Sequence, residues 1–289
     1  MASLLSVENL QVQFQTKKGI NTAVDGVSFS VEKGRILGIV GESGCGKSVT
    51  SMSILQLLGS NARISGGSIK LDGKELIGLP EKEMCRILGN DIAMIFQDPM
   101  TALNPTLTIG TQLMEPIMLH QNCGKKEAWT RAVDVLKRVG IAAPEKRMKE
   151  YPHQLSGGMR QRVMIAMAVS CEPRLLIADE PTTALDVTIQ AQILELMCEL
   201  REKMGTAIML ITHDMGVVAE TADDVLVLYA GKAVEYGSIE DIFERPKHPY
   251  TQGLLNSIPR LDEDVELLNT IEGTVPAPDA MPAGCRFAP

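Results

Sequence analysis

The segment Gly41–Ser48, which reads Gly-Glu-Ser-Gly-Cys-Gly-Lys-Ser, has the residue types and the spacing of a phosphate-binding loop. Its glycines allow a tight turn in which successive backbone N–H groups surround phosphate oxygens. The Lys47 ammonium can reach the β- and γ-phosphates of a nucleotide, and the Ser48 hydroxyl can bind Mg²⁺. A nearly continuous apolar run at 35–40 predicts a buried strand before the loop, and a helix from about 47 to 58 adds its positive end. This context favours a phosphate loop over a chance glycine-rich turn.

A second candidate for phosphate chemistry is the acidic pair Asp179 and Glu180, which follows the apolar run 175–178. Asp179, at the end of a predicted buried strand, can hold Mg²⁺ through its water shell. Glu180 is placed to polarise an attacking water, which predicts hydrolysis rather than transfer to a substrate hydroxyl. Acid pairs also occur at ordinary strand ends, but a phosphate loop in the same chain favours the functional interpretation.

The elements that must position these residues follow an alternation of strands and helices, which predicts an α/β fold with a largely parallel central sheet. A charged, mostly helical stretch at 106–151 is interpreted as an inserted lobe, broken at Pro116, Gly124, Gly140 and Pro144. After residue 247 we expect a helical appendage and an extended, proline-rich end. The expected strands are 7–14, 27–31, 35–40, 66–71, 92–96, 175–178, 207–211 and 225–228, and further helices are expected at 157–169 and 187–203.

Composition excludes several classes of protein. The 289 residues carry a formal net charge of −8, which speaks against a nucleic-acid binder. The longest apolar runs, 163–169 and 225–230, are far shorter than the roughly 20 residues of a membrane helix. No secretory signal is visible, and the six cysteines form no Cys-x-x-Cys pair. We therefore expect a reduced cytosolic compartment, no disulfides and no membrane span.

The segment 155–162, Leu-Ser-Gly-Gly-Met-Arg-Gln-Arg, resembles the signature motif of ATP-binding-cassette proteins. Segments 95–99, 183–186 and 211–214 resemble the glutamine loop, the D-loop and the switch-histidine loop of that family, and the resemblance covers about residues 4 to 260. It implies a P-loop NTPase (RecA-like) core with an N-terminal antiparallel β subdomain and an inserted α-helical subdomain. The implied domains are a cassette at 1–260, with its helical subdomain at about 98–160, and a proline-rich extension at 261–289 that we expect to be truncated.

Segments 245–251, 282–289 and 180–188 are similar to the oligopeptide, dipeptide and nickel importer branch of the family. The resemblance implies an ATP-hydrolysing subunit, peripheral at the cytoplasmic face of the membrane. Its implied partners are a second cassette, identical or related, two membrane permease subunits and, indirectly, an extracytoplasmic solute-binding protein. Peptides are the favoured cargo, and nickel or a nickel chelate is the alternative.

The resemblance also implies roles for single residues. Phe14 would stack on adenine, although an alternating-strand Phe is more often plain core. Gln97 would sense Mg²⁺, and His213 would hold the γ-phosphate and Glu180 in register. The opposite subunit would be contacted by Ser156, Gly157, Gly158, Met159 and Asp186. The implied nucleotide-binding residues are Phe14, Gly41, Glu42, Ser43, Gly44, Cys45, Gly46, Lys47, Ser48 and Val49; the implied catalytic ones are Glu180, His213 and Gln97; and the implied Mg²⁺ site, partly through water, is Ser48, Gln97 and Asp179.

Two positions depart from the family pattern. Met159 stands where the wider family often has Gln, and a methionine side chain can pack there but cannot hydrogen-bond to ribose. Some relatives continue beyond the Gly-Cys segment with further cysteines that bind an iron–sulfur cluster. Such clusters normally need four cysteine ligands, so no cluster is expected at Cys285.

Three other classes remain as alternatives. Soluble cassette ATPases of translation carry two cassettes, and those of chromosome maintenance carry a long coiled coil that 289 residues cannot hold. A P-loop small-molecule kinase would lack the segment 155–158. A non-enzymatic ATP-switched binding module is disfavoured by the presence of both Glu180 and His213.

Overall fold

The computed structural model describes residues 3–17, 19–182, 186–258, 271, 273–277 and 280–288. The chain divides into two compact units. Unit one comprises Met1–Gly78 and Met209–Pro289, and unit two comprises Leu79–Ile208. The expected domain boundary at 260/261 falls outside the described residues, and the expected limits of the helical subdomain stay predictions.

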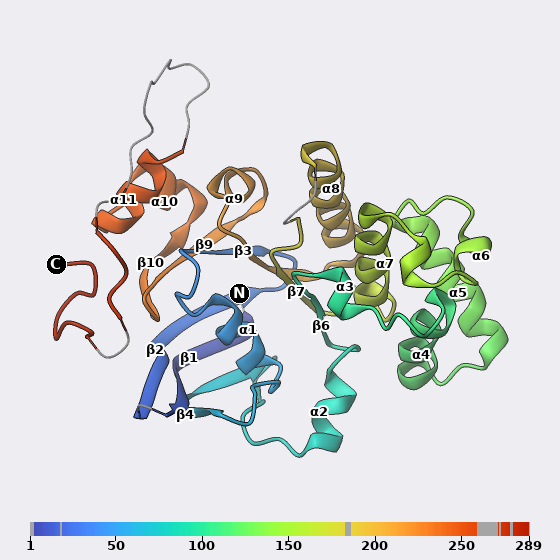
Figure 1. Ribbon diagram of the computed structural model, residues 1–289, viewed down its shortest axis with the longest axis horizontal. Coiled ribbons are helices and arrows are strands. Elements are labelled where there is room, and N and C mark those ends of the chain that lie inside the picture. The colour runs from blue at the N-terminus through green and yellow to red at the C-terminus, as the bar shows by residue number, and fades with distance from the viewer. Residues whose placement is uncertain are drawn as a thin grey trace. The chain divides into compact units, whose positions relative to one another are not determined.

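In unit one, the first layer is an antiparallel sheet in the strand order β2-β1-β4-β5 (Figure 1). Residues of β1 alternate between buried and exposed positions, as expected for a strand with one face on the core. Strands β1 and β2 form an antiparallel hairpin, in which Val7 pairs with Phe29 and Val12 with Val24. The strands are β1 (Ser3–Thr16), β2 (Gly19–Glu32), β4 (Ala62–Leu71) and β5 (Lys74–Glu75).

The second layer of unit one contains strands in the order β10-β9-β3-β8. Every residue of β3 is buried, because the strand is covered on both faces, and β3 pairs in parallel with β9. The elements are β3 (Ile36–Val40), α1 (Lys47–Ile54), β8 (Ala207–Ile211), α9 (Met215–Thr221), β9 (Asp224–Tyr229), β10 (Lys232–Ser238), α10 (Ile239–Glu244) and α11 (Pro249–Asn256). The unit boundary in the chain falls within β8. The predicted β3, β8 and β9 strands are confirmed.

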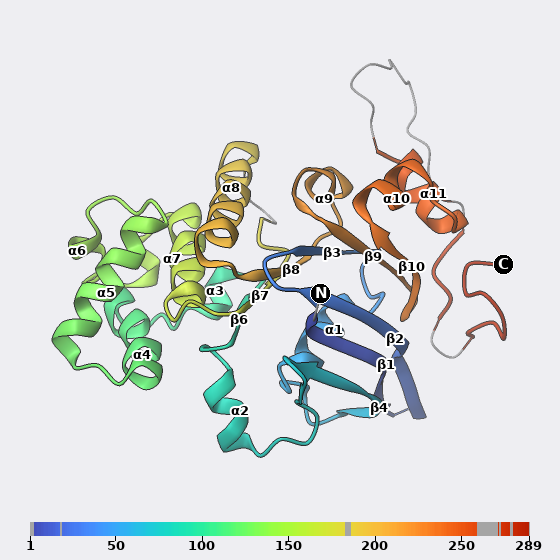
Figure 2. The same cartoon turned by 180° about the vertical axis from the view of Figure 1, so that it is seen from behind.

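Unit two contains a parallel pair, β6 and β7, and a group of helices that Figure 2 shows from behind. Ile92 pairs with Leu175 and Ile95 with Ala178, which brings the carboxyl ends of both strands to one edge. The elements are α2 (Glu81–Ile87), β6 (Ile92–Ile95), α3 (Pro99–Ala102), α4 (Ile109–Gln121), α5 (Lys125–Arg138), α6 (Pro144–Arg147), a 3₁₀ turn (Pro152–Gln154), α7 (Gly157–Val169), β7 (Leu175–Asp179) and α8 (Val187–Met204). Helix α8 buries an apolar face formed by Ile193, Leu196, Met197 and Leu200, and Ile189 on the same face is half-buried.

The structure differs from the expected elements at several places. Helix α1 ends at Ile54 rather than near residue 58, because Gln56 adopts a positive φ of 55° and the Leu57 N–H donates to the Met52 carbonyl. Pro116 does not break α4, since the fully buried Leu113 and Ile117 on either side anchor the helix. Strand β10 and helices α2 and α10 were not expected. Strand β10 is an edge strand of half-buried and exposed residues that gives no clear alternation.

No helix among the described residues combines the length and the apolar character needed to cross a membrane.

Candidate functional site

The phosphate loop lies in unit one between the end of β3 and the start of α1. Lys47, the first residue of α1, is only 6% exposed. Its Nζ donates to the carbonyl oxygens of Gly41 at 2.6 Å and Glu42 at 2.9 Å. The Cys45 N–H also donates to the Glu42 carbonyl, at 3.3 Å. The loop is thus a closed turn wrapped around the lysine ammonium.

Two loop positions admit only glycine. Gly41 has φ +148°, and a Cβ there would lie 2.1 Å from the Leu228 carbonyl oxygen of β9. Gly46 has φ +106°, and its Cβ would lie 3.0 Å from the Ala23 carbonyl oxygen of β2. Both glycines therefore allow the loop to pack directly against the backbone of β9 and β2, and this close packing restricts the shape of the loop.

The amides of the loop fit a phosphate ligand. Over the described part of the chain, the N–H groups of Gly44, Gly46 and Ser48 donate to no protein acceptor, whereas the Lys47 N–H donates to the Cys45 sulfur. They lie at the beginning of α1, where a helix leaves its first N–H groups without partners and carries partial positive charge. Ser43, Gly44 and Ser48 are exposed. Amides at a helix start, with those of Gly44 and Ser48 on exposed residues beside a lysine, are suited to bind an anion.

Burial raises the pKa of the Cys45 thiol, which Lys47 opposes to a lesser degree. The thiol is 2% exposed and remains neutral near pH 7. The neighbouring sulfur therefore contributes no negative charge that would compete with phosphate for Lys47.

In unit two, Gln97 and Glu180 are brought together. Gln97 follows β6 and Glu180 follows β7, so the parallel pairing of these strands delivers both side chains to one edge. The Gln97 Nε2 donates to Glu180 Oε2 at 2.9 Å. Glu180 has φ +47°, a conformation that non-glycine residues adopt uncommonly. The buried Gln161 side chain donates to the Pro181 carbonyl and holds the segment after Glu180.

The donor atoms fit a magnesium ion. Asp179 ends β7 and is only 6% exposed, so its carboxylate lies in a site partly shielded from water. Gln97 uses its Nε2 on Glu180, which leaves the amide oxygen for another role. Carboxylate, amide and hydroxyl oxygens are the ligands that Mg²⁺ prefers. The residues expected to hold the metal are therefore of the right chemistry.

The signature segment forms the N-terminus of α7. Ser156 is the N-cap, and its Oγ accepts from the Met159 N–H at 3.4 Å. Ser156 and Gly157 are exposed, and a Cβ at Gly157 would meet nothing within 4 Å. Asp186 similarly caps α8 by accepting from the Ile189 N–H at 2.9 Å. Thr183, Ala184 and Leu185 of the expected D-loop lie outside the described residues.

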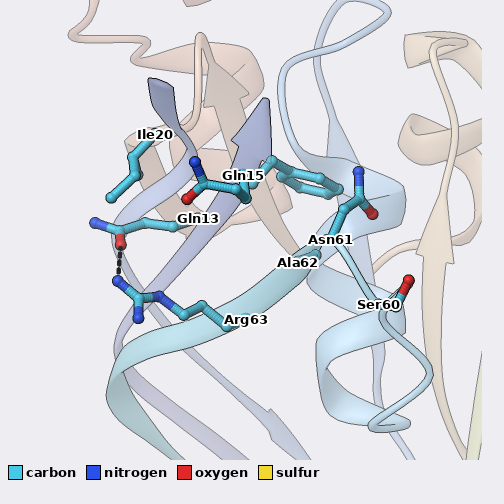
Figure 3. A pocket seen from close by; sticks show the side chains of 8 residues that line it. Gln13, Gln15, Ile20, Ser60, Asn61, Ala62 and Arg63 are labelled. Carbon is cyan, nitrogen blue, oxygen red and sulfur yellow. Dashed lines mark hydrogen bonds between the residues drawn. The ribbon is translucent and has the colours of Figure 1, made fainter. Parts of the chain in front are cut away.

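His213 and Phe14 both belong to unit one. His213 follows β8 and is exposed, next to Asp214, which caps α9. Phe14 lies on β1 and lines a cavity of about 320 Å³ (Figure 3). The wall of the cavity includes Gln13, whose Oε1 accepts from Arg63 at 3.3 Å. The expected roles of His213 and Phe14, like those of Val49 and the other site residues, stay predictions.

One further contact of the loop was not predicted from the sequence. The Glu42 N–H of the phosphate loop donates to the Tyr250 hydroxyl of α11 at 3.1 Å. Tyr250 is fully buried. It belongs to the segment 245–251, for which the sequence predicted only a similarity to an importer branch and no contact with the loop.

Comparison with known proteins decides the family. The sequence profile of the ABC transporter family matches residues 24–183. The oligopeptide transport ATP-binding protein AppD of Bacillus subtilis is 58% identical over 100% of this chain and 88% of its own length. The chain belongs to the ABC transporter family.

Other relatives agree with this assignment. The dipeptide transport ATP-binding protein DppD of Bacillus subtilis is 57% identical, over 100% of this chain and 86% of its own length. The oligopeptide transport ATP-binding protein OppD of Escherichia coli is 54% identical, over 99% and 85% respectively. A second profile, the C-terminal region of oligopeptide/dipeptide transporters, matches residues 234–289.

A solved structure extends the likeness to three dimensions. The dimeric ATP-binding cassette MJ0796, in a post-hydrolysis state bound to ADP and Pi, has a TM-score of 0.73 and 27% identity, covering 81% of this chain and 98% of that chain. The predicted family and fold are thereby confirmed: this ABC cassette has a P-loop NTPase core with an antiparallel β subdomain and an inserted helical subdomain. It binds and hydrolyses ATP, as predicted.

Proposed function

We propose that this chain powers the uptake of oligopeptides or dipeptides as the nucleotide-binding subunit of an importer. The observation that carries the proposal is the match of residues 234–289 to the C-terminal region of oligopeptide/dipeptide transporters. The names of the relatives AppD, DppD and OppD support the same cargo class.

The proposed chemistry divides between the two units. In unit one, the loop amides and Lys47 hold the triphosphate, Phe14 stacks on adenine and His213 contacts the γ-phosphate. In unit two, Glu180 polarises the attacking water, and its hydrogen bond to Gln97 orients the carboxylate. Mg²⁺, held by Ser48 and Asp179 with Gln97, would neutralise charge that develops on the phosphate oxygens.

The working unit is a head-to-tail dimer of cassettes, identical or related. Ser156, Gly157 and Gly158 of one copy present N–H groups at the start of α7 to the γ-phosphate bound by the other. The exposure of Ser156 and Gly157 and the dimeric form of the MJ0796 cassettes support this arrangement. ATP holds the dimer closed because its γ-phosphate is neutralised only when both halves meet. Hydrolysis removes that contact and the dimer opens.

The proposed partners are two integral membrane permease subunits, reached from the cytoplasmic face, and indirectly an extracytoplasmic solute-binding protein. Motion at Gln97 passes to the helices that follow it in unit two, and these contact the permeases. No nucleic acid takes part.

Transport by a reconstituted complex tests the cargo. The full chain is purified with its permease subunits, placed in proteoliposomes with ATP, and supplied with the solute-binding protein and either labelled peptides or labelled nickel. We expect peptide uptake that requires ATP and is abolished by Lys47→Ala, with Lys203→Ala as the surface control. Uptake of nickel without peptide, or failure of the chain to associate with any permease, would contradict the proposal.

A further inference from the structure

The Tyr250 hydroxyl is joined to the phosphate-binding lysine through a single loop residue. Its oxygen accepts from the Glu42 N–H at 3.1 Å, and the Glu42 carbonyl accepts from Lys47 Nζ at 2.9 Å. Tyr250 is fully buried, in the first turn of α11. Any displacement of this hydroxyl therefore moves the residue against which the lysine ammonium is held.

Aromatic rings fix the position of Tyr250. Its ring lies 4.5 Å, centroid to centroid, from that of Tyr229 at the end of β9. Phe287, close to the end of the chain, contacts both rings edge-on, at 5.4 Å from Tyr229 and 5.5 Å from Tyr250. Aromatic pairs at these separations are favourable beyond their buried area. The C-terminal segment 285–288 is thus part of the packing behind the loop.

Arg286 supports the same loop from another side. Its guanidinium donates to the Ala230 carbonyl and to the Asp25 carboxylate, and its side chain is 11% exposed. Asp25 donates its N–H to the Gly231 carbonyl at 2.8 Å, and Gly231 donates its own N–H to the Cys45 carbonyl of the loop at 3.0 Å. Arg286 therefore holds the turn between β9 and β10, and that turn is bonded to the phosphate loop.

We propose that Tyr250 is a positioning residue for the phosphate loop, and that Arg286 and Phe287 make the C-terminal segment a determinant of nucleotide affinity. This inference rests on the role of the loop given under Proposed function. It assigns to the end of the chain a part in ATP binding at a site formed about 240 residues earlier in the sequence.

The physical reason is preorganisation. A loop already held in its binding shape loses less conformational freedom when the triphosphate binds. Removing the Tyr250 oxygen leaves the Glu42 amide without its acceptor and allows the loop to relax. Burial, with the nearby Glu42, raises the pKa of the phenol, so the hydroxyl stays neutral over the working pH range.

Steady-state ATP hydrolysis by the purified transporter complex tests the proposal. Tyr250→Phe keeps the ring and removes one oxygen, and Tyr229→Phe is the matched control because, among the described residues, the Tyr229 hydroxyl makes no hydrogen bond to the loop amides while its ring packs against that of Tyr250. For Tyr250→Phe we expect KM for ATP to rise about three- to tenfold with kcat within about twofold. Tyr229→Phe should leave both unchanged. A merely structural role would lower the active fraction and kcat and leave KM as it was, and that result would overturn the proposal.

Arg286→Ala provides an independent arm, with Arg245→Ala as the control, since the only ion pair of Arg245 within the described part of the chain is an exposed one with Asp241. We expect a similar rise in KM for Arg286→Ala and none for the control. Hydrogen exchange of loop peptides containing Glu42 should accelerate in Tyr250→Phe and in Arg286→Ala. Unchanged exchange and unchanged KM in both variants would overturn the proposal.

Lys47→Ala separates failure of this inference from failure of the proposed function. If Lys47→Ala bound ATP as tightly as the wild type, the loop would not be the phosphate site and both ideas would fall. If Lys47→Ala lost affinity while Tyr250→Phe and Arg286→Ala did not, only the positioning role would be wrong.

Discussion

The phosphate loop of unit one and the Gln97–Glu180 edge of unit two, to which the proposed function gives separate roles, are built very differently. The loop is closed around a buried lysine and abuts backbone at Gly41. The unit-two edge presents an exposed Gln97, and the same unit presents the exposed helix start at Ser156. A hydrogen bond between Gln97 and Glu180 links the side chains there.

This difference suggests separate tasks for the two regions: the loop of unit one is built to bind nucleotide, and the exposed groups of unit two are built to switch contacts. A rigid loop can bind nucleotide in any state of the cycle, because its shape depends on neighbours within its own unit. Exposed groups that lie at strand ends and helix starts can form new contacts and release them, as a switch requires. Mutations in the loop and in the exposed groups of unit two can test this distinction separately.

The largest effect is expected from Glu180→Gln. The amide keeps the size of the side chain but cannot accept a proton from water, so turnover at saturating ATP should fall about 10²- to 10⁴-fold. Affinity for ATP, measured by fluorescence titration of the purified chain, should stay within about threefold of the wild type because the loop in unit one is untouched. Glu199→Gln, on the exposed side of α8, is the control. Wild-type hydrolysis by Glu180→Gln in the assembled transporter would remove this residue from its assigned role.

The rigidity of the loop is tested by Gly41→Ala against Gly44→Ala. Both glycines have positive φ, but a Cβ at Gly41 would lie 2.1 Å from the Leu228 carbonyl, while at Gly44 it would meet nothing within 4 Å. We expect the free energy of unfolding, measured in urea, to fall by about 3 kcal/mol or more for Gly41→Ala and by about 1 kcal/mol for Gly44→Ala. Equal losses would mean that close backbone approach does not shape the loop.

The position of the loop could be predicted because its sequence pattern is local. Residue types at fixed spacing, a buried strand before the loop and a helix after it point to Lys47 and Ser48, whose roles stay predictions. The pairing of β6 with β7 was also within reach, since continuous apolar runs predicted both strands and parallel strands end at one edge.

The contacts of Tyr250 and Arg286 with the loop region could not be predicted, because they are not local in the sequence. They join residues separated by more than 200 positions, and neither a tyrosine in a proline-rich segment nor a terminal arginine has a pattern that predicts its partner. Strand β10 was missed for a local reason: an edge strand does not need to alternate apolar and polar residues, so its sequence carries no strand pattern. Pro116 was misread as a break because burial of the surrounding apolar residues is a tertiary effect that propensity does not include.

The smallest effect is expected from Ser156→Ala, which sharpens the comparison because Ser238 offers a matched cap in unit one. Ser156 caps α7 and Ser238 caps α10, each by accepting an N–H from three residues on, at 3.4 Å and 3.2 Å. Loss of either hydroxyl should lower the free energy of unfolding by about 1 kcal/mol. Only Ser156→Ala should also weaken the ATP-dependent dimer, which can be followed by light scattering in a Glu180→Gln background. If Ser238→Ala weakened the dimer equally, the effect would be one of stability, and the start of α7 would not be the surface that meets the second copy.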